Sequence, residues 1–185
     1  DNTTTNDNTP LISGSAEVGS IVTIIDANLG VLGSVAVGNS GSWSFSPTLD
    51  DGTYTLTVTV TDAAGNVSNA TDPFTFTVDA TDPNITTLIA SDDNGATPFE
   101  IGDTGLTNDN TPLLSGVTTE ANAIITLYDN DVAIGSTTAD AGGNWSFSPA
   151  SLTDGDHVFT ATVTEEIGNV SQASAPCTIT VDATA

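Results

Sequence analysis

Short runs in which apolar and polar residues alternate recur along the whole chain, and this is the pattern of strands with one buried and one exposed face. The second half shows it most clearly. Alternation and the turn residues between the runs predict seven strands there, over 85–90, 112–116, 123–128, 132–137, 144–148, 157–164 and 177–181. A long acidic loop is expected over 91–110, between the first two strands. Seven short strands separated by turns are typical of an antiparallel β-sandwich.

Motifs of the first half return in the same order in the second half. The segment 6–11 returns at 108–113 and Trp-Ser-Phe-Ser-Pro at 43–47 returns at 145–149, in both cases 102 residues later. After one inserted residue the offset is 103, which relates Gly-Asn-Val-Ser at 65–68 to the same residues at 168–171. Matched motifs in matched order indicate tandem domains.

The repeat divides the 185 residues into two domains, 1–80 and 81–185, each large enough to bury a core. The predicted fold class is therefore all-β, with two tandem antiparallel Ig/fibronectin-III-like β-sandwiches arranged end to end. The first copy starts at its second strand, over 9–14, so its first strand is expected to be missing or truncated. We expect this first domain to be the less stable of the two.

Charge is the feature of the composition that most constrains partners and cofactors, because the chain has 24 Asp and Glu residues, one His and no Lys or Arg. Nucleic acids and anionic membranes are excluded as partners, since both need basic residues. No apolar run is long enough for membrane insertion, and no signal peptide is recognised. Clustered carboxylates repel one another unless cations neutralise them, which favours calcium as a cofactor. The alternative is that the acidity only keeps the protein soluble.

Three residue types that could take part in catalysis or ligand binding are better explained by structural roles. Cys177 is the single cysteine, so no intrachain disulfide can form, and alternation places it on the apolar face of its strand. His157 stands where the first copy has Tyr54, which follows a Gly turn as in a tyrosine corner. We interpret His157 as a substitute for that tyrosine rather than as a catalytic base. Trp43 and Trp145 are expected in the cores rather than on sugar-binding surfaces.

Sandwich topology gathers the acidic loops at the two ends of each domain. At the C-terminal end, three positions recur in both copies: Asp7 with Asp109, Asp26 with Asp129, and Asp79 with Asp182. The opposite end carries the loop before the last strand. Calcium takes six to eight oxygen ligands from carboxylates, Asn side chains, carbonyls and water. No EF-hand loop is present, so the candidate metal ligands rest on topology: Asp7, Asp26, Asp62, Asn66, Asp79, Asp82, Asp109, Asp129, Glu165 and Asp182.

The set of motifs Thr-Pro-Leu-x-Ser-Gly, Trp-Ser-Phe-Ser-Pro, Asp-Gly-Thr-Tyr-Thr-Leu, Thr-Asp-Ala-Ala-Gly-Asn-Val-Ser and Thr-Val-Asp resembles the bacterial Ig-like repeats of giant surface adhesins secreted by type I systems. The resemblance implies an extracellular rod on the bacterial surface, with calcium at its joints. By the same resemblance Asp79 and Asp82 are junction ligands, and Asp62 and Asn66 serve the joint with a preceding repeat. The second copy departs from this pattern with Glu165 in place of Asp62.

The main functional hypothesis is a structural extender of an adhesin, without catalysis, that projects a ligand-binding domain for adhesion or biofilm formation. Its partners are neighbouring repeats, and the chain is expected to behave as a monomeric fragment. A ligand-binding module for carbohydrate or host protein is the alternative, with an outward row at Thr55, Thr57, Thr59 and Thr61 as its candidate surface. Adjacent carboxylates such as Asp50 and Asp51 point apart in extended chain, which argues against a glycosidase.

Overall fold

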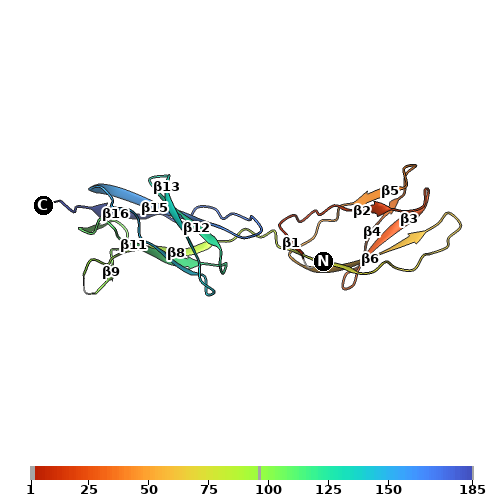
Figure 1. Ribbon diagram of the computed structural model, residues 1–185, viewed down its shortest axis with the longest axis horizontal. Coiled ribbons are helices and arrows are strands. Elements are labelled where there is room, and N and C mark those ends of the chain that lie inside the picture. Colours follow the sequence, from red (N-terminus) through yellow and green to blue (C-terminus); the bar gives the residue numbers. More distant parts are fainter. Residues whose placement is uncertain (1–2, 96, 185) are drawn as a thin grey trace. The chain divides into compact units, whose positions relative to one another are not determined.

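The computed structural model describes residues 3–95 and 97–184. The chain divides into two compact units, Asp1–Thr81 and Asp82–Ala185, called unit 1 and unit 2 below. All regular elements in the described residues are β-strands (Figure 1), which confirms the predicted all-β class. Accordingly, the part of the chain that is described has no helix with the length and apolarity needed to cross a membrane.

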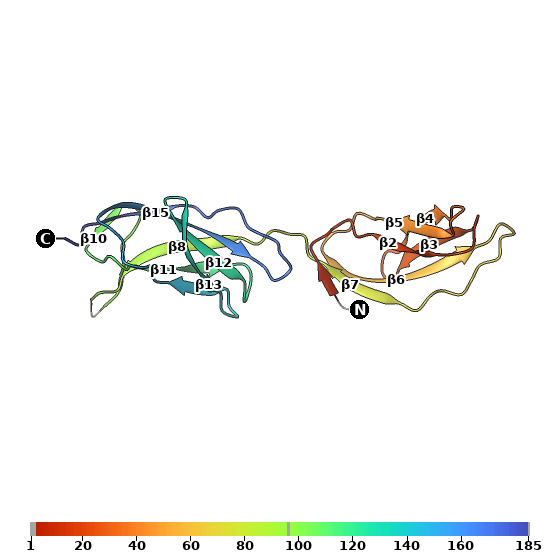
Figure 2. The same cartoon turned by 45° about the horizontal axis from the view of Figure 1, so that its top comes forward.

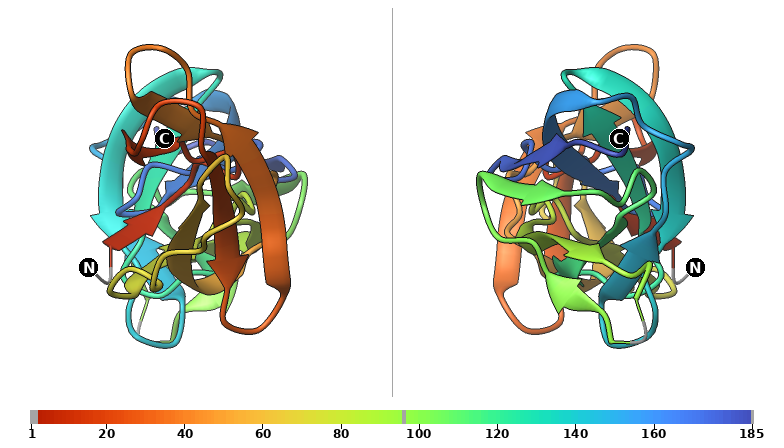
Figure 3. Two further views of the ribbon diagram at one scale, coloured as in Figure 1. Left: turned by 90° about the vertical axis from the view of Figure 1, so that its right-hand side faces the viewer. Right: turned by 90° about the vertical axis from the view of Figure 1, so that its left-hand side faces the viewer.

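Unit 2 is a sandwich of two sheets. One has the order β10-β16-β15-β12-β13 and the other β14-β11-β8-β9, and the right-hand view of Figure 3 shows the two layers. The strands are β8 (Ile85–Asp92), β9 (Phe99–Glu100), β10 (Gly105–Thr107), β11 (Leu113–Thr118), β12 (Ile124–Asp129), β13 (Val132–Thr138), β14 (Asn144–Phe147), β15 (Gly155–Thr164) and β16 (Cys177–Val181). All seven predicted strands are present.

The prediction of a loop over the whole of 91–110 was wrong in part. It contains β9, which extends the pairing of β8, and β10, which pairs in parallel with β16. The parallel pairing joins Gly105 to Ile179 and Thr107 to Val181. These strands are two and three residues long, too short to show alternation, and their pairing comes from partners that are distant in sequence.

Unit 1 repeats one of these sheets in full. Its strands are β1 (Thr3–Thr5), β2 (Ile12–Ser15), β3 (Ile21–Asp26), β4 (Gly30–Ala36), β5 (Ser42–Phe45), β6 (Gly52–Thr61) and β7 (Phe74–Val78). The five-stranded sheet has the order β1-β7-β6-β3-β4, and β1 pairs in parallel with β7 as β10 does with β16. In the described part of unit 1, the opposite layer consists of β2 and β5 (Figure 2).

The comparison of the two units identifies the strand that unit 1 lacks. β2 and β5 match β11 and β14, because Gly14 pairs with Trp43 as Gly116 pairs with Trp145. The described residues of unit 1 hold no counterpart of β8 or β9.

Each core lies between the two layers of its unit and is built by alternate residues of the strands. Ile125 and Leu127 on β12 are fully buried, as are Val22 and Ile24 on β3. Cys177 is buried in unit 2, as its place on the apolar face predicted. Trp145 is buried, whereas its counterpart Trp43 is only half-buried. The core prediction is thus confirmed for Trp145 and holds in part for Trp43, whose layer lacks a strand.

Candidate functional site

The predicted gathering of acidic loops at one end of each unit is present. In unit 1 the backbone N–H of Asp79 donates to the Thr5 carbonyl at 3.0 Å, and that of Leu49 donates to the Asn8 carbonyl at 2.8 Å. The end of β7, the segment before β2 and the segment before β6 therefore meet. Unit 2 repeats the arrangement, with hydrogen bonds from Asp182 to the Thr107 carbonyl at 2.9 Å and from Leu152 to the Asn110 carbonyl at 2.7 Å.

The first recurring pair of carboxylates, Asp7 and Asp109, shapes the turn before β2 and β11. The Oδ1 atom of Asp7 accepts hydrogen bonds from the N–H and hydroxyl of Thr9, at 2.8 and 2.9 Å. Asp109 accepts the same two bonds from Thr111, at 2.8 and 3.2 Å. Asp7 is exposed, but Asp109 is completely buried. Both are therefore turn-forming residues in the structure.

Unit 2 adds a second buried carboxylate beside Asp109, at the end of β8. Asp92 accepts a hydrogen bond from the Thr107 hydroxyl at 2.8 Å, and the same hydroxyl oxygen accepts one from the N–H of Asp109 at 3.0 Å. Asp92 was not among the candidate ligands. Its signal in the sequence is its place two residues after the predicted strand 85–90, at the same end of the sandwich as Asp109.

Asp26 ends β3 and organises the tight turn into β4. It is 2% exposed, and its Oδ1 accepts hydrogen bonds from the N–H groups of Asn28 and Leu29, both at 2.9 Å. Its Oδ2 accepts a bond from the N–H of Thr55 on β6, also at 2.9 Å. Burial raises the pKa of Asp26, but these backbone donors outweigh it, so the pKa lies below its ordinary value.

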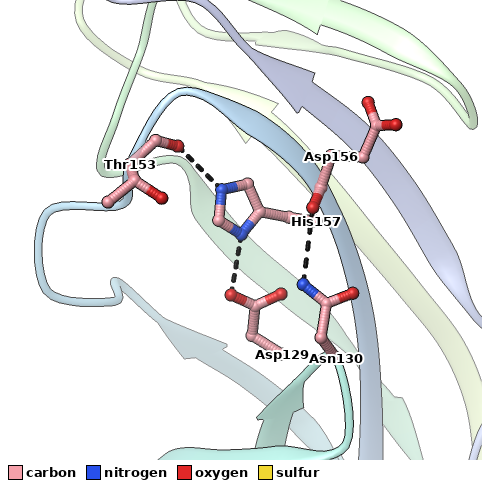
Figure 4. A network of polar contacts seen from close by, with 5 residues as sticks. All are labelled: Asp129, Asn130, Thr153, Asp156 and His157. Atoms are coloured by element: carbon pink, nitrogen blue, oxygen red, sulfur yellow. Dashed lines mark hydrogen bonds and ion pairs between the residues drawn. The ribbon is translucent and has the colours of Figure 1, made fainter.

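Asp129 stands at the same place in unit 2 but has a different partner (Figure 4). Its Oδ2 lies 2.7 Å from Nδ1 of His157. The other ring nitrogen of His157, Nε2, lies 2.9 Å from the Thr153 carbonyl. In unit 1, the hydroxyl of Tyr54 donates to the matching carbonyl, that of Asp50, at 2.7 Å. His157 therefore replaces the corner tyrosine, as predicted.

Both partners of the His157 ring are hydrogen-bond acceptors, so the protonated imidazole, which donates from both nitrogens, satisfies both of them. Burial lowers the pKa of His157, but the hydrogen bonds to Thr153 and Asp129 and the nearby negative charges of Asp129 and Asp156 outweigh it. The pKa consequently lies above the ordinary 6.5. A raised folded-state pKa stabilises unit 2 below pH 6.5, and this stability is lost as the pH rises through the raised value.

We expect the stability of unit 2 to fall by about 1.5–3 kcal/mol between pH 6 and pH 9, the magnitude of one hydrogen bond to a charged group. Urea unfolding followed by Trp145 fluorescence measures this. The control is His157→Tyr, which restores the corner residue of unit 1 and titrates only near pH 10. Identical pH profiles for the two proteins would contradict the assigned role of His157.

The opposite end of each unit carries a matched loop before β7 and β16. In unit 1 Asp62 accepts bonds from the backbone N–H of Asn66 at 2.8 Å and from its side-chain amide at 2.7 Å. The amide of Asn66 holds the pKa of Asp62 below its ordinary value. In unit 2 Glu165 accepts a bond from the Asn169 side chain at 3.0 Å. The candidate pairs are therefore bonded to each other, and the extra methylene of Glu165 is accommodated.

Two further aspartates hold the segments that leave β7 and β16, and they were not among the candidate ligands. Asp51 accepts hydrogen bonds from the N–H of Ala80 at 2.7 Å and from the hydroxyl of Thr81. Asp154 makes the same contacts with Ala183, at 2.9 Å, and with Thr184. The bond from the Thr81 side chain lowers the pKa of Asp51. Their recurrence before β6 and β15 was the available signal.

A calcium ion bound within one unit requires several converging oxygen atoms. Across 3–95 and 97–184, no group of three or more His, Cys, Asp and Glu side chains is placed to hold a metal ion. Asp79 is the first residue after β7 in unit 1, and Asp82 is the first residue of unit 2. An ion bound within one unit would have to complete its shell with carbonyls, amides and water.

Threonines of the outward row on β6 form side-chain hydrogen bonds with threonines on the neighbouring strand β7. Thr55 on β6 shares a hydrogen bond of 3.0 Å with Thr75 on β7, and Thr53 shares one of 3.1 Å with Thr77. Thr55, Thr57, Thr59 and Thr61 are all half-buried. Cross-strand threonine pairs of this kind stabilise a sheet.

A family model described as bacterial Ig-like domain matches the chain twice, over residues 1–80 and 81–183. The chain belongs to the bacterial Ig-like domain family. The two units are thus two bacterial Ig-like domains, and the predicted all-β tandem of Ig-like sandwiches is confirmed. This fold is typical of structural and binding modules. No curated protein matches the chain significantly.

Solved structures of low sequence identity are also similar to the chain. The BSP domain of a biofilm-associated protein is 21% identical with a TM-score of 0.36; the match covers the whole of this chain and 29% of that one. Fibronectin(III)-like modules of CbhA from Clostridium thermocellum are 12% identical with a TM-score of 0.41, covering 97% of this chain and 89% of theirs. The D00-D0 domain of intimin is 14% identical with a TM-score of 0.34, covering 98% and 96%.

Proposed function

We propose that these two bacterial Ig-like units belong to the structural extender region of a bacterial cell-surface adhesin secreted by a type I system. In this role the chain is a passive spacer, extracellular and without catalysis, that carries a distal ligand-binding domain away from the cell. Neighbouring repeats of the same protein are its partners. Membership in the bacterial Ig-like family and the tandem repeat within the chain support this proposal.

The observation that carries the proposal is the shortness of the connection between the repeats. On the unit 1 side, Asp51 binds Ala80 and Thr81. On the unit 2 side, the N–H of Asn84 donates to the Thr119 hydroxyl at 3.0 Å and its carbonyl accepts the N–H of Thr119 at 2.9 Å. Only two residues, Asp82 and Pro83, lie between these anchored segments.

Both residues of this connection favour restricted motion. Proline has a fixed φ angle, and the residue before a proline is confined to extended conformations. Pro83 is also buried. A spacer built from repeats benefits from such connections, because a flexible linker would let the distal domain fold back towards the cell.

We further propose that calcium stiffens the connection through Asp79 and Asp82. The chain has 24 Asp and Glu residues and no Lys or Arg, and two of these carboxylates, Asp79 and Asp82, lie at the connection. Like charges about 4 Å apart repel by about 1 kcal/mol in water and more near a protein surface. A divalent cation relieves this repulsion and accepts irregular oxygen geometry.

Thermal unfolding and small-angle scattering, each with EDTA and with millimolar calcium, test the proposal. Calcium is expected to raise the melting temperature by about ten degrees and to increase the radius of gyration, because ligands that bind only the folded state stabilise it. The variant Asp79→Asn/Asp82→Asn should lose both effects. Asp72→Asn, which removes an exposed carboxylate before β7, is the control and should retain them.

Two outcomes would contradict parts of this proposal. If calcium changes neither the melting temperature nor the radius of gyration, the carboxylates serve solubility and the stiffening role is wrong. If the chain binds a defined glycan on an array, the ligand-binding alternative replaces the spacer role.

A further inference from the structure

Unit 1 contains an apolar groove on the side where its two-stranded layer ends. The groove has a volume of 680 Å³. It lies between β2 on one side and β6 and β7 on the other, and β1 contributes at one end. Its main apolar lining consists of Leu11, Ile12, Trp43, Val58, Val60 and Phe74. Among the residues that the structure describes, no Asp or Glu lines it, although the chain has 24 of them.

The internal repeat shows what fills this place in unit 2. There β8 runs antiparallel to β11, with Leu88 opposite Gly116 and Ala90 opposite Leu114. The two strands lie side by side in Figure 1. Ile85 and Ala90 are buried in the core of unit 2, and Leu88 packs against it. β8 is thus a structural strand, and its counterpart position in unit 1 is the groove.

Side chains that β8 covers in unit 2 are open in unit 1. Phe74 is 47% exposed, whereas Cys177 at the same position of β16 is 7% exposed. Val58 and Val60 are half-buried, whereas their counterparts Ala161 and Val163 are fully buried. The groove therefore exposes apolar surface that belongs to a core.

The backbone of β2 has a vacant side as well. In unit 2, β11 pairs with β14 on one side and with β8 on the other. Among the described residues, β2 pairs only with β5. A strand edge with unpaired N–H and carbonyl groups is a template for another strand. The groove thus combines an apolar floor with an edge that can bind an extended backbone.

We propose that the groove of unit 1 binds one extended strand of the β8 type, supplied from outside these 185 residues. The strand is uncharged along its centre, runs antiparallel to β2, and places apolar side chains at alternate positions in the groove. In this register the residue matching Leu88 lies opposite Gly14, and the residue matching Ala90 lies opposite Ile12. The β8 strand of the same chain is not available, because it is buried in unit 2.

The probe for this site is a fluorescein-labelled synthetic peptide of residues 82–93, added to the complete chain. Fluorescence anisotropy should show saturable binding. A peptide with Leu88→Asp and Ala90→Asp places charges on the face directed at the groove, and its binding should be at least tenfold weaker. A peptide with Thr87→Asp and Ile89→Asp carries the same added charge on the opposite face, and its affinity should stay within about threefold of the unmodified peptide.

Variants of the protein provide an independent test at positions that do not endanger folding. Leu11 lines the groove and is 69% exposed, and Leu29 in the turn between β3 and β4 is 65% exposed. Leu11→Asp should weaken peptide binding at least fivefold, and Leu29→Asp should leave it unchanged. Hydrogen exchange should show that the bound peptide protects the amides of β2.

The proposal is overturned if the two charged peptides bind equally, or if peptide binding leaves the amides of β2 unprotected. It is also overturned if the chain without peptide forms a concentration-dependent dimer that protects β2, since a second copy would then be the occupant.

Discussion

Replacing Gly116 by alanine is expected to destabilise unit 2 by about 3 kcal/mol or more, the upper range for overpacking of a core. Gly116 lies on β11 between β8 and β14. A Cβ atom there would lie 1.9 Å from the carbonyl oxygen of Thr87 and 2.5 Å from Cζ2 of Trp145. Neither neighbour can yield easily, because Thr87 contributes backbone within a paired strand and Trp145 is buried.

The matched control is Gly14→Ala, the same position in unit 1. Its nearest neighbour is Cζ2 of Trp43, at 2.9 Å. Trp43 is half-buried and can shift, and the described part of unit 1 has no strand in the place of Thr87. The expected loss is about 1 kcal/mol or less. Hydrogen exchange followed by mass spectrometry measures the two units separately, and equal losses for the two variants would contradict the strand comparison.

Replacing Asp26 by alanine is expected to cost unit 1 about 3 kcal/mol. The substitution leaves three backbone N–H groups, those of Asn28, Leu29 and Thr55, without their acceptor in a buried position. Each unsatisfied buried donor costs on the order of 1–3 kcal/mol, and water reaching the turn offsets part of the sum. Denaturant unfolding followed by Trp43 fluorescence is the measurement.

Asp7→Ala is the control for the Asp26 variant, because Asp7 is an exposed turn residue that bonds only to Thr9 among the contacts of its carboxylate. Its expected cost is below about 1 kcal/mol. The pH dependence adds a second readout. Since the pKa of Asp26 is depressed, its contribution is present above the ordinary Asp value and is lost as the pH falls through the lowered pKa. An Asp26→Ala protein with unchanged stability at pH 7 would overturn the assignment.

The sequence alone was sufficient to predict those strands that are long enough to show alternation of apolar and polar residues. β12 and β15 are six and ten residues long and bury every second side chain. β1 and β10 could not be predicted, because three residues carry too little pattern and their parallel partners, β7 and β16, are distant in sequence. The internal repeat supplied its own reference for the first copy, whose described residues hold no counterpart of β8.

The sequence indicated where the recurring carboxylates lie in each unit, but it did not indicate their hydrogen-bond partners. Recurrence identified Asp26 and Asp129, and topology placed them at the right end of each unit. It could not show that Asp26 binds backbone donors while Asp129 binds His157. Asp51 was missed as a linker contact because its partners, Ala80 and Thr81, lie about thirty residues away. Charge alone does not distinguish a metal ligand from a hydrogen-bond acceptor.

The parallel pairing of β10 with β16, and of β1 with β7, has a mechanical consequence. In unit 1, β1 is the first strand along the chain and β7 is the last. In unit 2, β8 and β9 precede β10, so tension reaches β10 after they detach, and β16 is the last strand. Tension applied along the polypeptide therefore pulls the two parallel strands in opposite directions along their length. Their hydrogen bonds are loaded together in shear instead of opening one after another. In the extender role proposed above, resistance to extension would come from these two parallel pairs, each three residues long.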